Sequence, residues 1–333
     1  MDLSNEKVFH GARKIKYLLK ENKDSDKLVV VFSGFGPKGI KPKYNYIRTL
    51  QTLNVNKLFI LDEYGERGCY YLGENRVFDV ESSVVSLITF IANQNYISHS
   101  NIICCGSSKG GYAALYFGIK YGFGHVIAGA PQTKLGNYLF YAKEHPTLSY
   151  IAGDNSVESV YYLDKLLYDI VLNTRKIPEI TIHVGSGDHH YKGHVLPFVD
   201  HLKTINFNCE VDIKDYSDHG DVRHYQSLLI DKLIEKIPSL NDSLRILNVE
   251  VQRDLNSFQL ITNVNKPTQY AWYVYKNEER IMTKWYSTEN NFEFTATENG
   301  EYYFLAFVKD EHGNVMSERT NNFVVDEVKK IPL

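Results

Sequence analysis

The chain has 333 residues, with 37 Lys and Arg against 40 Asp and Glu, so its formal net charge is −3. This balance argues against a protein that coats nucleic acid or lies on an anionic membrane. Hydrophobic residues make up 43% and charged residues 23%, which is the composition of a folded protein rather than a disordered one. Apolar runs stay short of the roughly 18–20 residues that span a bilayer, so we expect no membrane span. The charge balance leads us to expect no nucleic-acid partner.

The N-terminal residues and the cysteines bear on the cellular compartment of the protein. The first residues, MDLSNE, are polar and acidic, and no long apolar stretch follows them, so we expect no signal peptide. Four cysteines in a chain of this length do not make a disulfide framework, and Cys104 and Cys105 are adjacent within an apolar run. We therefore predict a cytoplasmic protein in a reducing environment.

Residues 1–238 alternate short apolar runs with stretches of helical periodicity. The expected strands are 28–32, 57–61, 101–105, 125–128, 180–184 and 209–213. The expected helices are 80–95, 109–121, 157–172, 196–204 and 223–236. Runs that are apolar throughout suit strands buried on both faces of a parallel sheet. The alternation predicts a doubly wound, mostly parallel α/β domain.

The pattern changes after residues 237–239. Short strand-like runs then alternate with turn signals rich in Asn, Gly and Pro, and the runs include 257–262, 269–275, 292–295, 302–308 and 322–325. Six or seven short strands in this stretch predict a small antiparallel sandwich over residues 244–327. The expected linker is 238–243.

The chemistry-bearing motif is Gly-x-Ser-x-Gly, which here reads GSSKG from Gly106 to Gly110. It lies between the apolar run 101–105 and a predicted helix. In that context the serine sits on a tight turn, and the glycines leave room for the hydroxyl to project above the sheet. We therefore predict Ser108 as a nucleophile, against the plainer interpretation of a helix-capping serine.

A serine nucleophile needs a base and an acid that orients it. In this fold the chain order is serine, acid, histidine, and loops after the carboxyl ends of the strands form the site. Asp188 follows the strand 180–184, and His219 follows the strand 209–213. We predict Asp188 as the acid and His219 as the base. His224 is the competing base, but it falls at or inside the next helix.

The oxyanion of an acyl-transfer reaction needs hydrogen-bond donors. We expect the backbone N–H of Lys109, the residue after the nucleophile, and the backbone N–H of Phe35, in the loop after the strand 28–32. The Lys109 side chain is expected to point to solvent or to an acidic group of a substrate.

Residues 134–173 are longer than a plain crossover between strands, and they are rich in tyrosine. We expect this insertion to form a cap over the nucleophile that selects the substrate. The candidate substrate-binding residues are Gly34, Tyr138, Tyr141 and His189.

Four strings carry a resemblance to a known superfamily, and they are VVVFSGFG at 29–36, CGSSKGGYAA at 105–114, GDH at 187–189 and DHG at 218–220. Residues from about 28 to 236 resemble the α/β-hydrolase superfamily. Within it they resemble the branch that includes the accessory-Sec glycan O-acetyltransferase component and related capsule-locus proteins. The tail, with Tyr270, Trp272-Tyr273, Tyr275 and Tyr302-Tyr303, resembles immunoglobulin-like "three-tyrosine" sandwich domains of bacterial polysaccharide systems.

The resemblance implies that the nucleophile, acid and base are Ser108, Asp188 and His219. It implies a serine esterase or O-acyltransferase acting on acyl esters of a bacterial glycan, with acetyl the favoured acyl group. Neither a metal nor an organic cofactor is required. Partner proteins would come from polysaccharide or glycoprotein assembly.

Three other functions fit parts of the sequence. Residues 34–39 match the dinucleotide fingerprint Gly-x-Gly-x-x-Gly, with Asp62 downstream, but Pro37 and Pro42 disrupt a helix there. One region is crowded with metal-ligating side chains, which fits a metal-dependent deacetylase, and these are His183, Asp188, His189, His190 and His194. A catalytically inactive glycan-binding protein is the third alternative. In that case alternate aromatic residues of the run 270–275 should face solvent.

Overall fold

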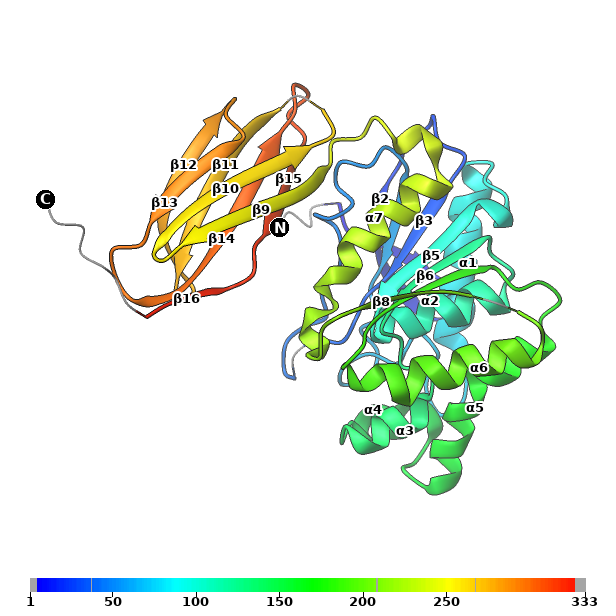
Figure 1. Cartoon of the computed structure of the whole chain (residues 1–333). Helices are drawn as coiled ribbons and strands as arrows, with labels where there is room; N and C mark the ends of the chain where they lie inside the picture. Colours follow the sequence, from blue (N-terminus) through cyan, green and yellow to red (C-terminus); the bar gives the residue numbers. More distant parts are fainter. Residues whose placement is uncertain (1–4, 37, 208, 267, 327–333) are drawn as a thin grey trace, which may run out of the picture. The chain divides into compact units, whose positions relative to one another are not determined.

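The computed structural model describes residues 5–36, 38–207, 209–266 and 268–326 (Figure 1). These residues form two compact units. One unit comprises the chain up to Ile47 together with Asn54–Leu240, and the other comprises Arg48–Leu53 together with the chain from Asn241 onward. The short segment Arg48–Leu53 thus belongs with residues that lie far from it in the sequence, and Thr52 Oγ1 donates to the carbonyl oxygen of Leu244 at 3.3 Å.

The first unit is built on an eight-stranded sheet in the order β1-β2-β4-β3-β5-β6-β7-β8. The strands from β4 through β3 to β8 pair in parallel, and β1 and β2 form an antiparallel edge. The strands are β1 (Lys7–His10), β2 (Lys14–Lys20), β3 (Leu28–Phe32), β4 (Asn56–Ile60), β5 (Ile102–Ser107), β6 (His125–Gly129), β7 (Glu179–Gly185) and β8 (Glu210–Lys214).

Helices cover both faces of this sheet. They are α1 (Asp79–Gln94), α2 (Lys109–Lys120), α3 (Leu135–Tyr141), α4 (His145–Ala152), α5 (Val157–Asn173), α6 (Leu196–Thr204) and α7 (Tyr225–Lys236). Val30 and Phe32 of β3 join one core with α1 and α2, while the alternate residues Val29 and Val31 are buried on the opposite face. There α7 packs so closely that a Cβ on Gly129 would lie 2.7 Å from the Tyr225 ring (Figure 1).

The structure confirms the predicted doubly wound, mostly parallel α/β architecture. The predicted run 28–32 coincides with β3, and the other five predicted strands overlap β4 to β8. The antiparallel edge strands β1 and β2 were not among the predicted elements. The insertion 134–173 contains the three helices α3, α4 and α5.

The second unit is a sandwich of two antiparallel sheets, with orders β13-β10-β9 and β12-β11-β14-β15, and β16 also pairs with β14. Its strands are β9 (Ile246–Asp254), β10 (Ser257–Val264), β11 (Gln269–Lys276), β12 (Glu279–Ser287), β13 (Asn291–Thr295), β14 (Gly300–Lys309), β15 (Val315–Arg319) and β16 (Phe323–Val325). Trp272 faces Phe292 of the other sheet at 5.6 Å between ring centroids, and Phe258 faces Phe304 at 5.1 Å. The eight strands seen in the described part exceed the six or seven expected, because β9, β12 and β15 carry many polar residues.

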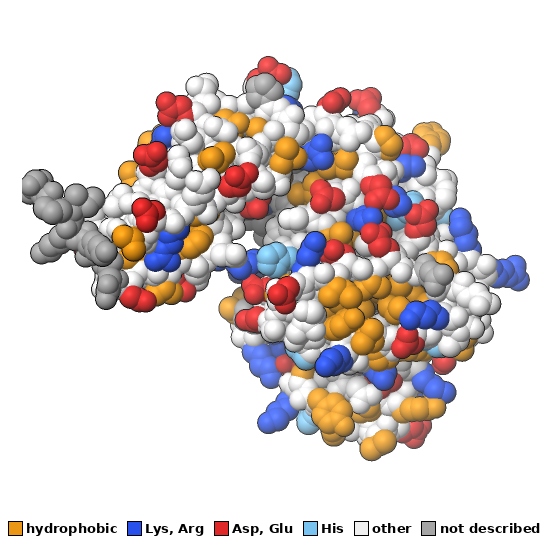
Figure 2. Space-filling model, viewed as in Figure 1, with side chains coloured by type: hydrophobic (Ala, Val, Ile, Leu, Met, Phe, Trp, Pro, Cys, Tyr) orange, Lys and Arg blue, Asp and Glu red, His pale blue; other side chains and the backbone are white. Residues whose placement is uncertain are grey.

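Residues 238–243, expected as the linker, begin with a short 3-10 helix, Pro238–Leu240. Acidic and basic side chains are interspersed on the face drawn in Figure 2, which fits the near-neutral net charge. Within the described ranges, no helix combines the length and the hydropathy that a bilayer crossing requires.

Candidate active site

Ser108 lies on a strained turn between β5 and α2. Its backbone φ is 54° and its ψ is −117°, a conformation that few serines adopt. The flanking glycines make the turn possible, since a Cβ on Gly106 would lie 2.6 Å from the Gly110 carbonyl oxygen. A Cβ on Gly110 would in turn collide with the carbonyl oxygen of Phe32. This is the strand–turn–helix context predicted for Gly-x-Ser-x-Gly.

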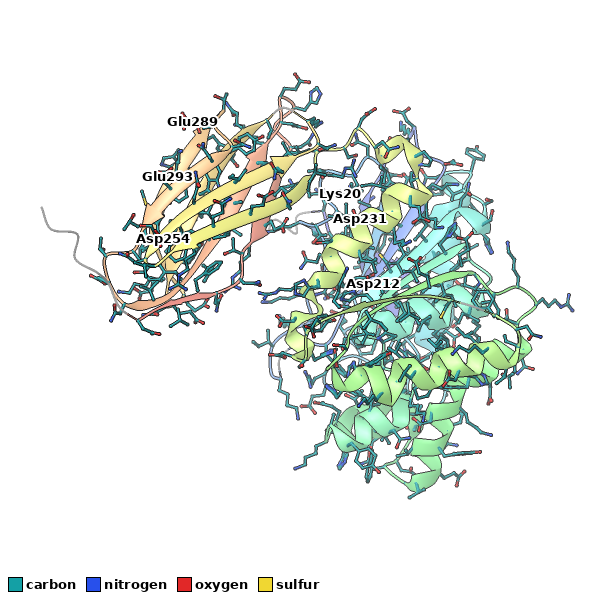
Figure 3. The ribbon with its side chains drawn as sticks, in the orientation of Figure 1. Lys20, Asp212, Asp231, Asp254, Glu289 and Glu293 are labelled. Atoms are coloured by element: carbon teal, nitrogen blue, oxygen red, sulfur yellow. The ribbon has the colours of Figure 1, made fainter. Side chains whose placement is uncertain are left out.

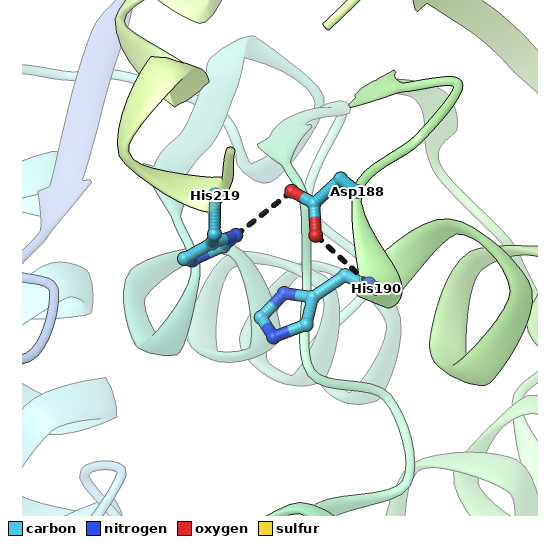
Figure 4. Close-up of side chains that lie close together, drawn as sticks. All are labelled: Asp188, His190 and His219. Atoms are coloured by element: carbon cyan, nitrogen blue, oxygen red, sulfur yellow. Dashed lines mark hydrogen bonds and ion pairs between the residues drawn. The ribbon is translucent and has the colours of Figure 1, made fainter. Parts of the chain in front are cut away.

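A chain of hydrogen bonds joins Ser108, His219 and Asp188. His219 Nε2 lies 3.1 Å from Ser108 Oγ. His219 Nδ1 lies 2.8 Å from Asp188 Oδ2 (Figure 4). A carboxylate accepts only, so Nδ1 carries the hydrogen and Nε2 is free to accept from the serine hydroxyl. His219 therefore holds the tautomer that a general base next to a serine requires.

Loops after neighbouring strands present these two residues. Asp188 follows β7, and His219 opens the short 3-10 helix His219–His224 that follows β8. Asp218 Oδ1 accepts from the Gly220 amide at 2.8 Å, which fixes the turn. His224 stacks instead on Tyr216, with ring centroids 5.5 Å apart. The structure thus brings His219, rather than His224, to Ser108.

The Asp188 carboxylate is buried, and it accepts hydrogen bonds from neighbouring groups of the protein. Burial alone would raise its pKa, but the hydrogen bonds from the His219 ring and the His190 backbone N–H lower it below the ordinary value. The His190 amide donates to Asp188 Oδ1 at 2.9 Å (Figure 4). Asp188 is therefore ionised at neutral pH and can stabilise an imidazolium on His219.

A second imidazole packs against the first. The His190 ring is fully buried, and its centroid lies 4.0 Å from that of His219. Its Nδ1 donates to the Ala130 carbonyl oxygen at 2.9 Å, and burial lowers its pKa to about 3. His190 is therefore neutral and adds no positive charge beside His219.

Sequence reasoning missed Gln132, which contacts the hydroxyl of Ser108. Gln132 is fully buried, and its Nε2 donates to Ser108 Oγ at 2.8 Å. The Tyr70 hydroxyl donates to Gln132 Oε1 at 2.6 Å and so orients the amide. The available signal was position, because Gln132 follows the carboxyl end of β6, at the edge of the sheet that holds the site.

The loop after β3 lies beside the turn at Ser108. A Cβ on Gly34 would be 3.6 Å from the Ser107 carbonyl oxygen, and the Gly34 amide already donates to Asn45 Oδ1 at 2.8 Å. The next residue is Phe35, whose ring packs edge-on against Tyr70 at 5.4 Å. The two segments predicted to supply oxyanion donors are therefore neighbours.

The expected orientation of the Lys109 side chain is wrong. Lys109 is 1% exposed, and its Nζ lies 2.7 Å from Asp62 Oδ2. The helix α2 begins inside the unit, and a lysine there needs a buried anion as its partner, which Asp62 provides. Asp62, which would have bound a ribose in the dinucleotide hypothesis, is thus committed elsewhere. The described residues between β3 and β4 also form no helix after the Gly34–Gly39 string.

A pocket of about 460 Å³ lies beside this site. It is lined by Lys134, Asn137, Tyr138, Tyr141, Ala142, His189, Gly193 and His194. Three of the four predicted substrate-binding residues, Tyr138, Tyr141 and His189, therefore share one cavity, and Gly34 lies outside its lining. The helix α3 from the insertion forms much of the wall.

The histidines of the metal hypothesis do not converge on one ligand site. Both ring nitrogens of His183 form hydrogen bonds within the chain. Nδ1 lies 2.7 Å from Oδ2 of Asp212, which is labelled in Figure 3, and Nε2 lies 3.1 Å from the Tyr216 hydroxyl. His194 Nδ1 accepts from the Lys134 amide at 3.2 Å. Within the described residues, the group of side chains close enough to share an ion is Asp188, His190 and His219. Two of these belong to the hydrogen-bonded chain at Ser108.

The sheet order, the turn at Ser108 and the placement of the loops define the first unit as an α/β-hydrolase fold. Comparison with known proteins found no matching family model and no match among curated proteins. Solved structures do match.

One neighbour is the capsule O-acetyltransferase of Neisseria meningitidis serogroup A, with a TM-score of 0.61 and 24% identity over 69% of this chain and 93% of that one. A second is the glycosylation-associated Gap123 complex of Streptococcus agalactiae, with a TM-score of 0.60 and 16% identity over 70% of this chain and 47% of that one. A third is the fluorophosphonate-binding serine hydrolase FphF of Staphylococcus aureus, with a TM-score of 0.53 and 16% identity over 69% of this chain and 96% of that one. At these identities the likeness is one of fold.

Proposed function

We propose that this protein is a serine-dependent esterase or O-acyltransferase that acts on acyl esters, chiefly acetyl esters, of a glycan. The observation that carries the proposal is the chain of hydrogen bonds from Ser108 through His219 to Asp188, on a strained turn at the carboxyl edge of the sheet. Nucleophile, base and orienting acid within hydrogen-bond reach are what nucleophilic catalysis by serine requires.

The proposed reaction proceeds through an acyl-enzyme. Ser108 Oγ attacks the acyl carbon while His219 Nε2 takes the hydroxyl proton, and Asp188 holds the imidazolium that forms. The backbone N–H groups of Lys109 and Phe35 stabilise the oxyanion, and one such donor contributes about 10²–10³ in kcat. His219 then returns the proton to the leaving group, which is the alcohol of an ester or the thiol of a thioester. Water or a sugar hydroxyl, deprotonated by His219, resolves the acyl-enzyme.

The choice of an acetylated glycan rests on likeness and on the pocket. The first neighbour is a capsule O-acetyltransferase, and a histidine variant of that protein was solved with CoA. The adjacent pocket, lined by tyrosine, asparagine and lysine side chains, suits a polyhydroxylated ligand. Acetyl-CoA is therefore the first acyl donor to test, and an oligosaccharide the first acceptor.

The same likeness suggests partners. A second neighbour is a glycosylation-associated complex, so we propose that this chain works with proteins of polysaccharide or glycoprotein assembly. A reducing, cytoplasmic location fits Cys69, Cys104, Cys105 and Cys209, all of which are free thiols.

The direct test is labelling with a fluorophosphonate followed by peptide mapping. We expect one adduct, on the peptide that carries Ser108, and none in Ser108→Ala. Hydrolysis and transfer are then separated by following acetyl groups from acetyl-CoA to water or to an oligosaccharide. Ester turnover that survives Ser108→Ala but is abolished by a chelator would overturn the proposal in favour of metal-dependent chemistry.

A further inference from the structure

A buried ion pair lies directly behind the proposed oxyanion hole. Lys109 Nζ and Asp62 Oδ2 are 2.7 Å apart, and the two side chains are 1% and 0% exposed. The partners are 47 residues apart in the sequence. We propose that the backbone N–H of this lysine binds the oxyanion. Its charged end bonds to Asp62 rather than to Ser108 or His219.

Asp62 also organises the loop that follows β4. Both of its carboxylate oxygens accept from the Cys69 amide at 3.0 Å, and Oδ2 accepts from the Tyr71 amide at 3.3 Å. Gly68 closes over the pair with a φ of 98°, and a Cβ there would lie 2.6 Å from Asp62 Oδ2 and 2.9 Å from Lys109 Nζ. The loop can therefore take this path only around the ion pair, and only with glycine at this position.

From this loop, side chains hold the other arm of the oxyanion hole. The Tyr71 hydroxyl accepts from the Ser33 amide at 2.6 Å and donates to the Ile60 carbonyl oxygen at 2.9 Å. Arg67 Nε donates to the Gly36 carbonyl oxygen at 3.1 Å, and the guanidinium lies 4.5 Å from the centre of the Phe35 ring. The backbone at Ser33 and at Gly36, on either side of residues 34 and 35, is thus held by the loop that Asp62 organises.

We infer that Asp62 is a positioning residue, which sets the two oxyanion donors, Lys109 N–H and Phe35 N–H, at their working separation. The inference rests on the proposed function. Oxyanion stabilisation depends on donors that are fixed in place before the reaction, and small displacements are costly. A buried ion pair contributes little net stability compared with apolar side chains of the same size, but it has one defined geometry. That property suits a positioning role.

The test compares Asp62→Asn with a matched control, a second buried carboxylate whose lysine partner also lies on α2. Glu81 is also buried, pairs with Lys120 of α2 at 2.6 Å and accepts from the Tyr116 hydroxyl at 2.8 Å. Glu81→Gln therefore removes a buried negative charge of the same kind, away from the proposed site. Both variants should lose stability. We expect kcat for p-nitrophenyl acetate to fall about 10–100-fold in Asp62→Asn, with KM unchanged, and to stay near wild type in Glu81→Gln.

A second readout reports the oxyanion itself. A trifluoromethyl ketone adds to the serine hydroxyl to give a hemiketal whose oxyanion occupies the same hole. Its affinity should fall in Asp62→Asn by the same factor as kcat, and the hemiketal should protonate at a higher pH. Equal kcat and equal inhibitor affinity in Asp62→Asn and Glu81→Gln would overturn the inference.

Two further arms keep the result interpretable. If Asp62→Asn does not fold, Tyr71→Phe removes the hydroxyl at Ser33 and leaves the ion pair, and kcat should fall about tenfold with KM unchanged. Wild-type kcat in Tyr71→Phe would then overturn the inference. Fluorophosphonate labelling of the wild type at Ser108 is measured first. Its failure removes the proposed function, whereas normal labelling with no effect at Asp62 removes the positioning role alone.

Discussion

The proposed mechanism gives Asp188 and His219 different roles, so substitutions of the two residues should lower kcat by different factors. In the proposed mechanism Asp188 orients the imidazole and stabilises its charge, whereas His219 moves the proton. We expect His219→Ala to lower kcat for p-nitrophenyl acetate by about 10⁵–10⁶ and Asp188→Asn by about 10⁴. Steady-state kinetics on both variants check this order.

Ser107 supplies the matched control, since it precedes the proposed nucleophile and its hydroxyl forms a hydrogen bond with that of Tyr46. Ser107→Ala should keep its turnover within a few-fold of wild type. A larger loss in Asp188→Asn than in His219→Ala would contradict the roles assigned to the two residues.

Two buried neutral histidines predict how stability depends on pH. Burial lowers the pKa of His190 to about 3 and that of His194 to about 4, from an ordinary 6.5. Between the ordinary pKa of 6.5 and the lowered pKa of each histidine, the unfolded chain therefore binds more protons than the folded one. Their contribution to stability is complete above about pH 6.5 and is lost as the pH falls, by up to about 1.4 kcal/mol per pH unit for each histidine.

Urea unfolding between pH 7 and pH 4.5 measures this loss. The slope of the unfolding free energy against pH should be shallower in His194→Gln than in wild type by one proton. Identical slopes in the two proteins would show that His194 is protonated in the folded state, contrary to the prediction.

At the scale of elements, the helix α3 should decide which substrates fit. Tyr138 and Tyr141 line the pocket from this helix, and Tyr138 also packs edge-on against His190 at 5.5 Å. Tyr138→Ala should raise KM for an acetylated oligosaccharide about tenfold, because it removes a large contact surface. Turnover of p-nitrophenyl acetate, which is too small to fill the pocket, should change much less.

Tyr161 on α5 is the control, because it belongs to the same insertion, is 59% exposed and does not line the pocket. Tyr161→Ala should leave both substrates unaffected. If Tyr138→Ala and Tyr161→Ala have the same KM for the oligosaccharide, α3 plays no part in selection.

The elements differ in how well the sequence predicts them. The run 28–32 is apolar throughout and matches β3, because a strand buried on both faces has a pattern that few other structures share. The strand β2, which lies between β1 and β4, alternates Lys14 and Lys16 with buried Ile15 and Tyr17. This signal is present in the sequence but is short and rich in charge.

The candidate site was predictable where motif and chain order coincide, as for Ser108, Asp188 and His219. The Lys109–Asp62 pair was not, because nothing local in the sequence distinguishes a buried lysine from an exposed one at a helix start. Its burial follows from the path of the loop after β4, which depends on contacts between segments far apart in the chain. Gln132 follows the carboxyl end of β6, but position alone does not select it from the other residues that follow strand ends.

At the scale of the whole molecule, some aromatic side chains of the sandwich lie on its outer face, outside the core between the two sheets. Along β11, Trp272 is buried toward the other sheet, whereas Tyr273 is half-buried on the outer face. The Tyr273 ring lies 4.6 Å from that of Phe307 and 6.5 Å from that of Trp285, which is 71% exposed. The alternation expected of a glycan-stacking surface is therefore present only in part, because Tyr270 is buried and Tyr273 is half-buried.

Trp285→Ala should weaken binding of a polymeric acetylated glycan about tenfold and leave turnover of p-nitrophenyl acetate unchanged. Leu247→Ala, at an exposed position on β9 in the other sheet, is the control. Calorimetric titration with the polymer checks both. Equal affinities would leave the sandwich without a role in glycan binding.

The central claim is that an acyl group passes through Ser108, and trapping that intermediate tests it most directly. The protein is mixed with p-nitrophenyl acetate or acetyl-CoA, quenched in acid within the first turnover, digested and examined by mass spectrometry. We expect one acetyl group on the peptide that carries Ser108, which appears faster than steady-state turnover and is absent in Ser108→Ala. Turnover that proceeds with no acetyl group on that peptide, or an acetyl group that remains after Ser108→Ala, would contradict it.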